Sequence, residues 1–480
     1  MKKNSLKQNF VFQMIYQILI YAIPLVIAPY LTRTLGGKSL GIYTYVNSIA
    51  YYFLLFINLG INRHGQRVIA STRDNDIKLR KSFWSLLSFH TIVSIIGIFA
   101  YIIFIVFFCK NNRTIFLIQT MYVLSAFVDI TWLFYGLENF KSVAIKNMMV
   151  KIFECVCIFS LVKNTNDLVV YTIIVSISVL LGQAIMIPQA LKIVKPIRFS
   201  VDDVKQHIKP MCVLFISVIA TTLYTVFDKT LLGILSNTIE NVAYYEYANK
   251  IVTIPKVIIS VVGTVIFPRA CKCAAEHDRK SQKQVMKFSC IMASILGSAS
   301  VFGLAAVAKK LSIVYYGAEF VTSGEVMICM APLILIVSLG DTFRSGYLIP
   351  SHKDNVYVIS NVTSAVLNLI ASSLLIPYIG IYGAISGTLL AEIIGFILQA
   401  YACRCIFGLK DIIETLFPAL GIGLIMYIVV YKIDKITAYN FKWLGCEIII
   451  GIVVYFVGIL IISNIFYKDY LKIILRKNKK

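Results

Sequence analysis

The sequence has few charged residues and very few acidic ones. Charged residues occupy only 14% of the 480 positions, about half the share found in soluble proteins, whereas 59% of the positions are hydrophobic. The mean hydropathy is +0.81. These values exclude an ordinary soluble enzyme, because a water-soluble fold could not cover so much apolar side chain with polar groups. We therefore predict a polytopic membrane protein.

Polar segments long enough to form a soluble domain are also lacking. Apolar windows of about 20 residues, the length that crosses roughly 30 Å of hydrocarbon, recur along the whole chain. We predict an all-α bundle of about 14 transmembrane helices, with 12 as the alternative, because strand-like alternation is absent and backbone groups in lipid must be satisfied within each segment. The predicted spans are 10–30, 41–62, 83–108, 115–136, 145–162, 168–190, 210–235, 243–267, 285–308, 325–349, 356–377, 379–401, 412–432 and 444–466.

The basic residues are unevenly distributed among the predicted loops. There are 46 of them against 23 acidic residues, which gives a net charge of +23. With the N-terminus inside, 31 basic residues fall on inner segments and 10 on outer loops. In a membrane protein such an excess reports topology. We therefore predict that both termini are cytoplasmic, and we expect no nucleic-acid partner.

The 11 cysteines are an odd number and lie mostly in predicted spans or on inner loops. A zinc site would normally combine closely spaced cysteines with histidines, and the five histidines are scattered. We predict reduced thiols, with neither a metal site nor a cofactor.

A weak internal repeat suggests two halves. Residues 42–49 and 244–251 share Tyr, Tyr, Asn and Ile at corresponding positions. Two six-helix halves would enter the membrane from the same side, which gives parallel repeats around a central cavity and suits a transporter. We predict one bundle in residues 1–200, a second in pseudo-twofold arrangement in residues 201–405, and two additional helices with a basic tail in residues 406–480.

Charged residues inside the predicted spans need an explanation, because each costs about 2.5–3.5 kcal/mol at the bilayer centre. Three pairs of opposite sign share a helix face: Lys151 with Glu154, Glu246 with Lys250, and Asp341 with Arg344. Mutual neutralisation is one interpretation of these pairs, and a role in transport is the other. Lys256 follows Pro255, has no such partner within its turn, and is the best single candidate for a cation in the cavity.

The chemistry of a cationic cavity favours a phosphate or pyrophosphate headgroup, held by Lys and Arg beside a carboxylate. Asp129 or Glu392 would be suited to carry a coupling ion. Asp228 and Lys229 are adjacent, so their side chains point about 100° apart and cannot simply pair. Arg33 either extends to the outer interface or faces the cavity.

Several short motifs occur in an order that is fairly specific. They are residues 29–36 (Pro-Tyr-Leu-Thr-Arg-Thr-Leu-Gly) with 41–43, then 129–138, 224–229 with 232–233, 245–250, 268–269, 344–350 and 368–383 with Pro377 and Gly380, ending at Glu392. Over residues 1 to about 400 the chain resembles the Wzx-type oligosaccharide repeat-unit flippases of the multidrug/oligosaccharidyl-lipid/polysaccharide exporter superfamily, whose fold is that of the MATE transporters.

The resemblance implies movement of an undecaprenyl-pyrophosphate-linked oligosaccharide from the cytoplasmic to the outer leaflet of the bacterial plasma (inner) membrane by alternating access, driven by an ion gradient or the membrane potential. It implies a pathway that makes O-antigen, capsule or exopolysaccharide, with a polymerase and chain-length proteins as partners beside membrane lipids. Basic residues that line the cavity would map onto Arg33, Lys229, Lys250 and Arg344. The family usually has twelve spans, so the last two helices are a departure.

The predicted site combines both lines of argument. Its substrate-binding cations are Arg33, Lys229, Lys250, Lys256 and Arg344, and its ion-coupling or supporting acids are Asp129, Asp228, Glu246, Asp341 and Glu392.

Three other functions would produce related sequences. A lipid II flippase would differ only in its cargo headgroup, and a drug or metabolite antiporter would prefer an acidic, aromatic cavity. A membrane polysaccharide polymerase or glycosyltransferase would show a long outer loop or an acidic catalytic pair. The sequence has neither a long outer loop nor an acidic catalytic pair in a soluble segment. It also lacks a nucleophile–base arrangement and a phosphate-binding loop, so we predict that the protein is not an enzyme.

Overall fold

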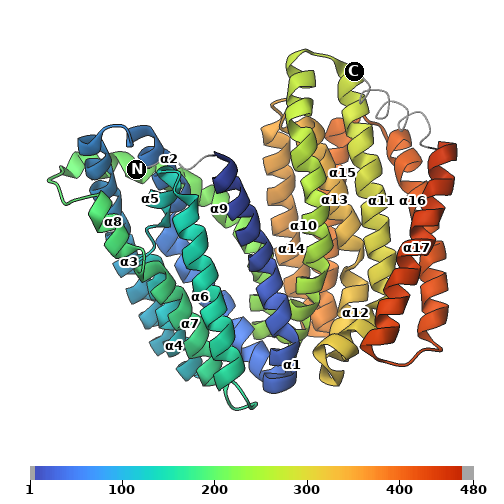
Figure 1. Cartoon of the computed structure of the whole chain (residues 1–480), viewed down its shortest axis with the longest axis horizontal. Helices are drawn as coiled ribbons and strands as arrows, with labels where there is room; N and C mark the ends of the chain where they lie inside the picture. The colour runs from blue at the N-terminus through green and yellow to red at the C-terminus, as the bar shows by residue number, and fades with distance from the viewer. Residues whose placement is uncertain (1–5, 467–480) are drawn as a thin grey trace. The chain divides into compact units, whose positions relative to one another are not determined.

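The computed structural model describes the backbone of residues 6–466 and the side chains of residues 20, 22–215 and 226–462 (Figure 1). All of the regular elements in this part of the chain are helices. Contacts between residues divide the chain into two compact units, Met1–Gly233 and Ile234–Lys480. The predicted second bundle begins with the helix Val201–Leu235, which lies almost entirely in unit 1. The bundle boundaries at residues 200 and 405 stay a prediction.

Unit 1 is built from nine helices in the described residues, the last of which ends just beyond it. They are α1 (Leu6–Asn58), α2 (Ile61–Thr72), α3 (Asp76–Phe108), α4 (Arg113–Phe127), α5 (Thr131–Gly136), α6 (Phe140–Leu161), α7 (Leu168–Ala184), α8 (Ile187–Ile193) and α9 (Val201–Leu235). α1 is broken at Gly36, whose φ of 73° is open to glycine and strained for other residues. This break separates the predicted spans 10–30 and 41–62.

One end of unit 1 contains helix α2, which the sequence analysis had assigned to a loop. The helix is amphipathic and packs Ile61 and Ile69 into a core that includes Trp132 of α5. A hydrogen-bonded chain joins α2 to α9 and α3: His64 Nε2 lies 3.0 Å from His207 Nδ1, and His207 Nε2 lies 3.2 Å from Ser85 Oγ.

The direction of this chain follows from Arg67, whose guanidinium lies 3.3 Å from His64 Nδ1 and can only donate. His64 Nδ1 therefore accepts, its Nε2–H donates to His207, and the Nε2–H of His207 donates to Ser85. Both imidazoles are neutral in this arrangement.

Unit 2 comprises the remaining helices. They are α10 (Glu240–Ala275), α11 (Arg279–Leu311), the π-helix η1 (Ser312–Tyr316), the 3-10 turn η2 (Ala318–Phe320), α12 (Val321–Met330), α13 (Pro332–Phe343), the π-helix η3 (Arg344–Leu348), α14 (Asp354–Ile379), α15 (Ile381–Cys403), α16 (Leu409–Asp434) and α17 (Phe441–Phe466). α14 and α15 form a close hairpin in which a Cβ added to Gly383 would lie 2.5 Å from the backbone nitrogen of Ile376. Small residues are what permit such approach between membrane helices.

The last two helices pack on α11, as Figure 1 shows for the red end of the chain. Their residues share a core with α11 that includes Ala306, Ile422 and Tyr455. The predicted additional pair, residues 406–480, is thus an integral part of unit 2 as far as Phe466.

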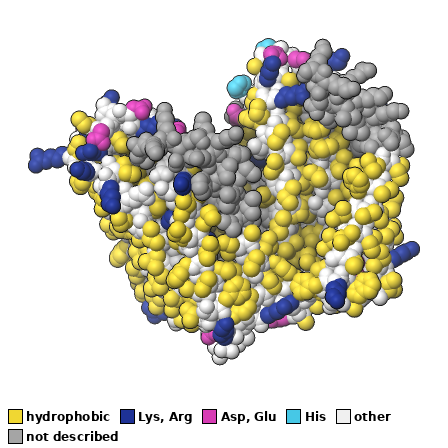
Figure 2. Space-filling model, in the orientation of Figure 1, with side chains coloured by type: hydrophobic (Ala, Val, Ile, Leu, Met, Phe, Trp, Pro, Cys, Tyr) yellow, Lys and Arg dark blue, Asp and Glu magenta, His cyan; other side chains and the backbone are white. Residues whose placement is uncertain are grey.

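Each predicted span falls on helical segments, and 11 helical stretches in the described residues are long and apolar enough to cross a membrane. Several spans are less regular than predicted: for example, 115–136 is interrupted between α4 and α5, 168–190 is interrupted between α7 and α8, and 325–349 is divided among α12, α13 and η3. Large apolar side chains such as Phe99 of α3 and Phe456 of α17 are exposed, and Figure 2 shows hydrophobic side chains covering the sides of the helices. The chain is a multi-pass membrane protein.

Candidate functional site

Helix α10 carries a charged pair near its beginning. The Nζ of Lys250 lies 3.8 Å from Glu246 Oε1, and the two side chains are 32% and 17% exposed. The same Nζ lies 4.2 Å from the centre of the Tyr247 ring, a cation–π contact. The predicted pairing of Glu246 with Lys250 is confirmed. The acid and the ring reduce the cost of the cation in the membrane and leave part of it accessible.

A second pair lies where α13 passes into η3. Arg344 Nη2 is 2.6 Å from Asp341 Oδ1, so this predicted pair is confirmed as well. Arg344 also donates from Nη1 to the Tyr357 hydroxyl of α14 at 3.4 Å, and its guanidinium carbon lies 5.6 Å from the Tyr357 ring centre. Single π-turns often occur at functional sites, and η3 begins at Arg344 itself.

Close packing brings η3 against α10. A Cβ added to Gly263 of α10 would lie 2.9 Å from the Ser345 hydroxyl, so only glycine allows this approach without a shift. Arg344, the neighbour of Ser345, is therefore held beside the helix that carries Lys250 and Lys256.

Lys256 is partly buried, and Glu392 of α15 is the acid that acts on it electrostatically. Lys256 follows Lys250 by six residues, which on a helix is about 9 Å along the axis and about 120° around it. The two lysines therefore present different faces of α10. Among the predicted site residues, unit 2 thus holds two cation–acid couples, Lys250 with Glu246 and Arg344 with Asp341, while the charge of Glu392 influences Lys256.

The other four predicted residues lie in unit 1. Arg33 is exposed on α1, three residues before the break at Gly36. Asp129 is buried, and its Oδ1 accepts from the backbone N–H of Thr131 at 2.9 Å and from the Thr131 hydroxyl at 2.6 Å. Asp129 thus accepts from the first backbone N–H of α5, whose N-cap residue is Ile130. Asp228 is buried on α9 beside the half-buried Lys229.

A buried charge network in unit 2 was missed by the sequence analysis. Lys310 of α11 is 0% exposed and forms ion pairs with Glu447 of α17 and with Asp434 of α16, the latter at 2.9 Å. Its Nζ also donates to the Thr437 hydroxyl at 2.7 Å. The sequence analysis had placed Lys310 on an outer loop, and the available signal was Glu447, an isolated acid within the last apolar run.

A second buried lysine is Lys146 of α6, which the sequence analysis counted on an inner segment although it lies at the beginning of the predicted span 145–162. Its Nζ donates to Gln183 Oε1 of α7 at 3.0 Å, and Asp129 acts on it electrostatically. The third predicted pair, Lys151 with Glu154, is confirmed at 2.8 Å on the same helix. α6 therefore satisfies its intramembrane charges within unit 1.

Within the described residues no cluster of three or more His, Cys, Asp or Glu side chains is suited to hold a metal ion. The 11 cysteines are free thiols.

Two curated relatives match most of the chain. A protein named as a candidate O-antigen transporter of Shigella dysenteriae is 25% identical over 378 residues, which cover 78% of this chain and 94% of that protein. A protein with the same name from Escherichia coli strain K12 is 22% identical over 349 residues, covering 71% of this chain and 83% of that protein. The names of these relatives describe transport and no enzymatic activity, which agrees with the prediction that the chain is not an enzyme.

Solved structures establish the fold. The lipid II flippase MurJ in an inward closed conformation superposes with a TM-score of 0.77 at 17% identity, and the match covers 96% of this chain and 100% of the MurJ chain. An inward-facing multidrug resistance MATE family transporter of the MOP superfamily superposes with a TM-score of 0.61 at 12% identity, covering 83% and 98%. The predicted MATE-like, all-helical fold is confirmed, and the exact number of spans stays a prediction.

The family model described as "Polysaccharide biosynthesis protein" matches residues 6–274. This range includes all of the described unit 1 and all but the last residue of α10, the helix that carries Lys250 and Lys256. The predicted resemblance to polysaccharide flippases is thereby confirmed, and the chain belongs to the polysaccharide biosynthesis protein family.

Proposed function

We propose that this protein moves an undecaprenyl-pyrophosphate-linked oligosaccharide repeat unit from the cytoplasmic to the outer leaflet of a bacterial plasma membrane by alternating access. The family match and the relatives named as O-antigen transporters support a cargo of this class. The repeat unit would then enter the synthesis of O-antigen, capsule or exopolysaccharide. In this proposal both termini are cytoplasmic, and a polymerase and chain-length proteins act on the delivered lipid.

The observation that carries this proposal is the partial exposure of cations within membrane-spanning helices of unit 2. The side chains of Lys250 and Arg344 are 32% and 36% exposed, whereas Lys310 is 0% exposed. A charge exposed to hydrocarbon is costly, so the accessible parts of Lys250 and Arg344 are expected to face water or an anionic cargo. Lys310 is ion-paired with Asp434 and Glu447 and is not available for cargo.

The couples suit a pyrophosphate that must be bound and then released. Lys and Arg form charge-assisted hydrogen bonds to phosphate oxygens, and the neighbouring carboxylates limit how tightly the cations hold them. Tyr247 and Tyr357, which already contact Lys250 and Arg344, offer aromatic faces suited to sugar rings beside the pyrophosphate.

We further propose that Arg33 and Lys229 contribute cations from unit 1. Asp228, Glu246, Asp341 and Glu392 would tune the cations or carry a coupling ion. Asp129 stays a candidate for the same role, although its hydrogen bonds to Thr131 already occupy one of its oxygens.

The test is to delete the gene and analyse lipid-linked intermediates on each leaflet. The proposal predicts that a completed repeat unit accumulates facing the cytoplasm. Accumulation of lipid II would instead identify a lipid II flippase, shortened sugars would identify a transferase, and an unchanged lipid pool would refute both a flippase and a transferase.

The site is tested by charge reversal in the complemented strain. Lys250→Glu and Arg344→Glu are expected to abolish export while the protein is inserted normally. Lys272→Glu, on the same helix as Lys250 but exposed at its end, is the matched control and is expected to export. If Lys229→Glu exports at the wild-type rate, the assignment of Lys229 is wrong.

A further inference from the structure

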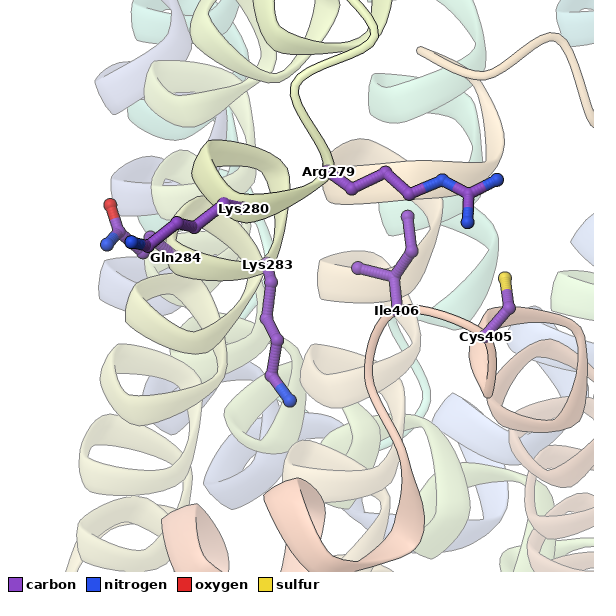
Figure 3. A pocket seen from close by; sticks show the side chains of 6 residues that line it. All are labelled: Arg279, Lys280, Lys283, Gln284, Cys405 and Ile406. Atoms are coloured by element: carbon purple, nitrogen blue, oxygen red, sulfur yellow. The ribbon is translucent and has the colours of Figure 1, made fainter.

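A basic pocket at one end of unit 2 takes no part in the proposed transport site. It has a volume of about 300 Å³ and is lined by Arg279, Lys280, Lys283 and Gln284 of α11 and by Cys405 and Ile406 of the turn before α16. Figure 3 shows the Arg279 side chain extending over Ile406, while Lys283 projects from the next turn of α11. Every charged group in the lining is a cation.

Within the part of the chain that the structure describes, two of these cations are left without an ion pair, although nearby cations are paired. Lys283 lies 2.8 Å from Asp411, and Lys287 lies 3.2 Å from Glu414. Arg279 and Lys280, by contrast, form no ion pair among the residues that the structure describes. The acid next to them in sequence, Asp278, caps α11 by accepting from the Ser281 N–H at 3.0 Å, and it acts on Lys280 electrostatically without forming an ion pair with it.

Topology alone does not account for this arrangement. A positive charge on an inner loop can orient a helix wherever it lies, and it needs neither a concave site nor neighbours of the same sign. Placing Arg279 and Lys280 together at one pocket costs repulsion, which an anion in the pocket would offset.

The predicted start of the span in α11 would place the pocket near the headgroup layer of a membrane. The predicted span of α11 begins at residue 285, so Lys283 lies about 3 Å and Arg279 about 9 Å beyond the hydrocarbon at 1.5 Å per residue. The headgroup layer on each side of a bilayer is about 5–8 Å thick. Basic pockets between helices at this depth on the cytoplasmic side are suited to anionic lipid headgroups.

We propose that this pocket binds a phosphate group at the inner membrane surface, supplied by an anionic phospholipid headgroup or by soluble phosphate. Arg279 offers a planar fork of N–H donors, Lys280 and Lys283 offer ammonium groups, and Gln284 offers a neutral amide. The site lies apart from the residues proposed for transport. It depends on the proposed orientation of α11 but not on the identity of the transported cargo.

Cys405 provides a direct probe, because its exposed thiol lies in the pocket wall. The full chain carrying Cys212→Ser and Cys446→Ser, which removes the other exposed thiols, would be placed in nanodiscs and labelled with a soluble maleimide. Labelling would be compared in phosphatidylcholine, in phosphatidylcholine with about one-fifth cardiolipin, and in phosphatidylcholine with inorganic phosphate at matched ionic strength.

We expect labelling of Cys405 to be at least about threefold slower with cardiolipin than without it. The Arg279→Gln/Lys280→Gln variant should lose this protection, whereas Arg279→Lys/Lys280→Arg should keep it. A matched double variant on the loop of unit 1, Lys195→Gln/Arg198→Gln, removes the same charge and should also keep it.

Each outcome decides the proposal. Protection by cardiolipin assigns the phosphate to a lipid, and protection by inorganic phosphate alone assigns it to a soluble anion. Equal labelling rates under all three conditions would overturn the proposal. If cardiolipin slows the labelling of Cys405 equally in the Arg279→Gln/Lys280→Gln variant, the proposal is also overturned. The protection of Cys405 would then come from general surface charge and not from the cations of the pocket. Since transport is not measured, failure here leaves the proposed function standing.

Discussion

Removal of Lys310 is expected to be among the most destabilising single changes in unit 2. Lys310→Met keeps an unbranched side chain only one atom shorter and leaves Glu447, which is 0% exposed, and Asp434 without their cation. Breaking a buried ion pair by removing one partner costs about 3–5 kcal/mol. The adjacent Lys309 is the matched control, because its pair with Glu325 is 52% and 41% exposed and is worth about 0–1 kcal/mol.

The assay is unfolding of the purified protein in mixed detergent micelles, with the midpoint measured for wild type, Lys309→Met, Lys310→Met and Lys310→Met/Glu447→Gln. The double variant should recover a large part of the loss, since it removes one of the two uncompensated charges. Equal midpoints for Lys309→Met and Lys310→Met would refute the argument that the last two helices are anchored by a buried charge network.

Three further predictions concern packing, the site and pH. Gly383→Ala should destabilise the α14–α15 hairpin by about 1–3 kcal/mol, whereas Gly421→Ala, with open space at its Cβ, should be nearly neutral in the same unfolding assay. Tyr357→Ala should reduce export by up to about tenfold, and Tyr357→Phe by about threefold or less, in complementation measurements, because the ring contact to Arg344 outweighs the long hydrogen bond. Burial lowers the pKa of His207, so below about pH 6.5 the unfolded chain binds a proton at this residue more readily than the folded one does, and unit 1 should lose stability. A His207→Gln variant should show less of this loss. The measurement is the unfolding midpoint from about pH 7.5 to 5.

Local features of the fold were predictable from the sequence, because they depend on residues close together in the chain. The pairs Glu246–Lys250 and Asp341–Arg344 are three or four residues apart, and helical geometry alone places them on one face. The apolar runs likewise located the helices. Gly36 was part of a recognised motif, but its positive φ became evident only in the structure.

Features that depend on contacts between distant residues could not be predicted. Lys310 and Glu447 are 137 positions apart, and no periodicity relates them. Helix α2 was missed because its pattern is amphipathic rather than apolar, and its stability comes from packing against Trp132. The electrostatic influence of Glu392 on Lys256 also required the structure, because the two residues lie on different helices, α15 and α10.

The central claim is that this chain transfers a pyrophosphate-linked oligosaccharide lipid between leaflets by means of the half-buried cations of unit 2. The most direct test places the purified full chain in vesicles with a fluorescent undecaprenyl-pyrophosphate-linked oligosaccharide and measures the fraction that a membrane-impermeant quencher reaches. We predict that wild type makes nearly all of the lipid reachable with time, whereas the Lys250→Gln/Lys256→Gln/Arg344→Gln variant leaves the inner-leaflet fraction protected. A wild-type protein that moves none of this lipid, or a triple variant that moves it equally fast, would contradict the account.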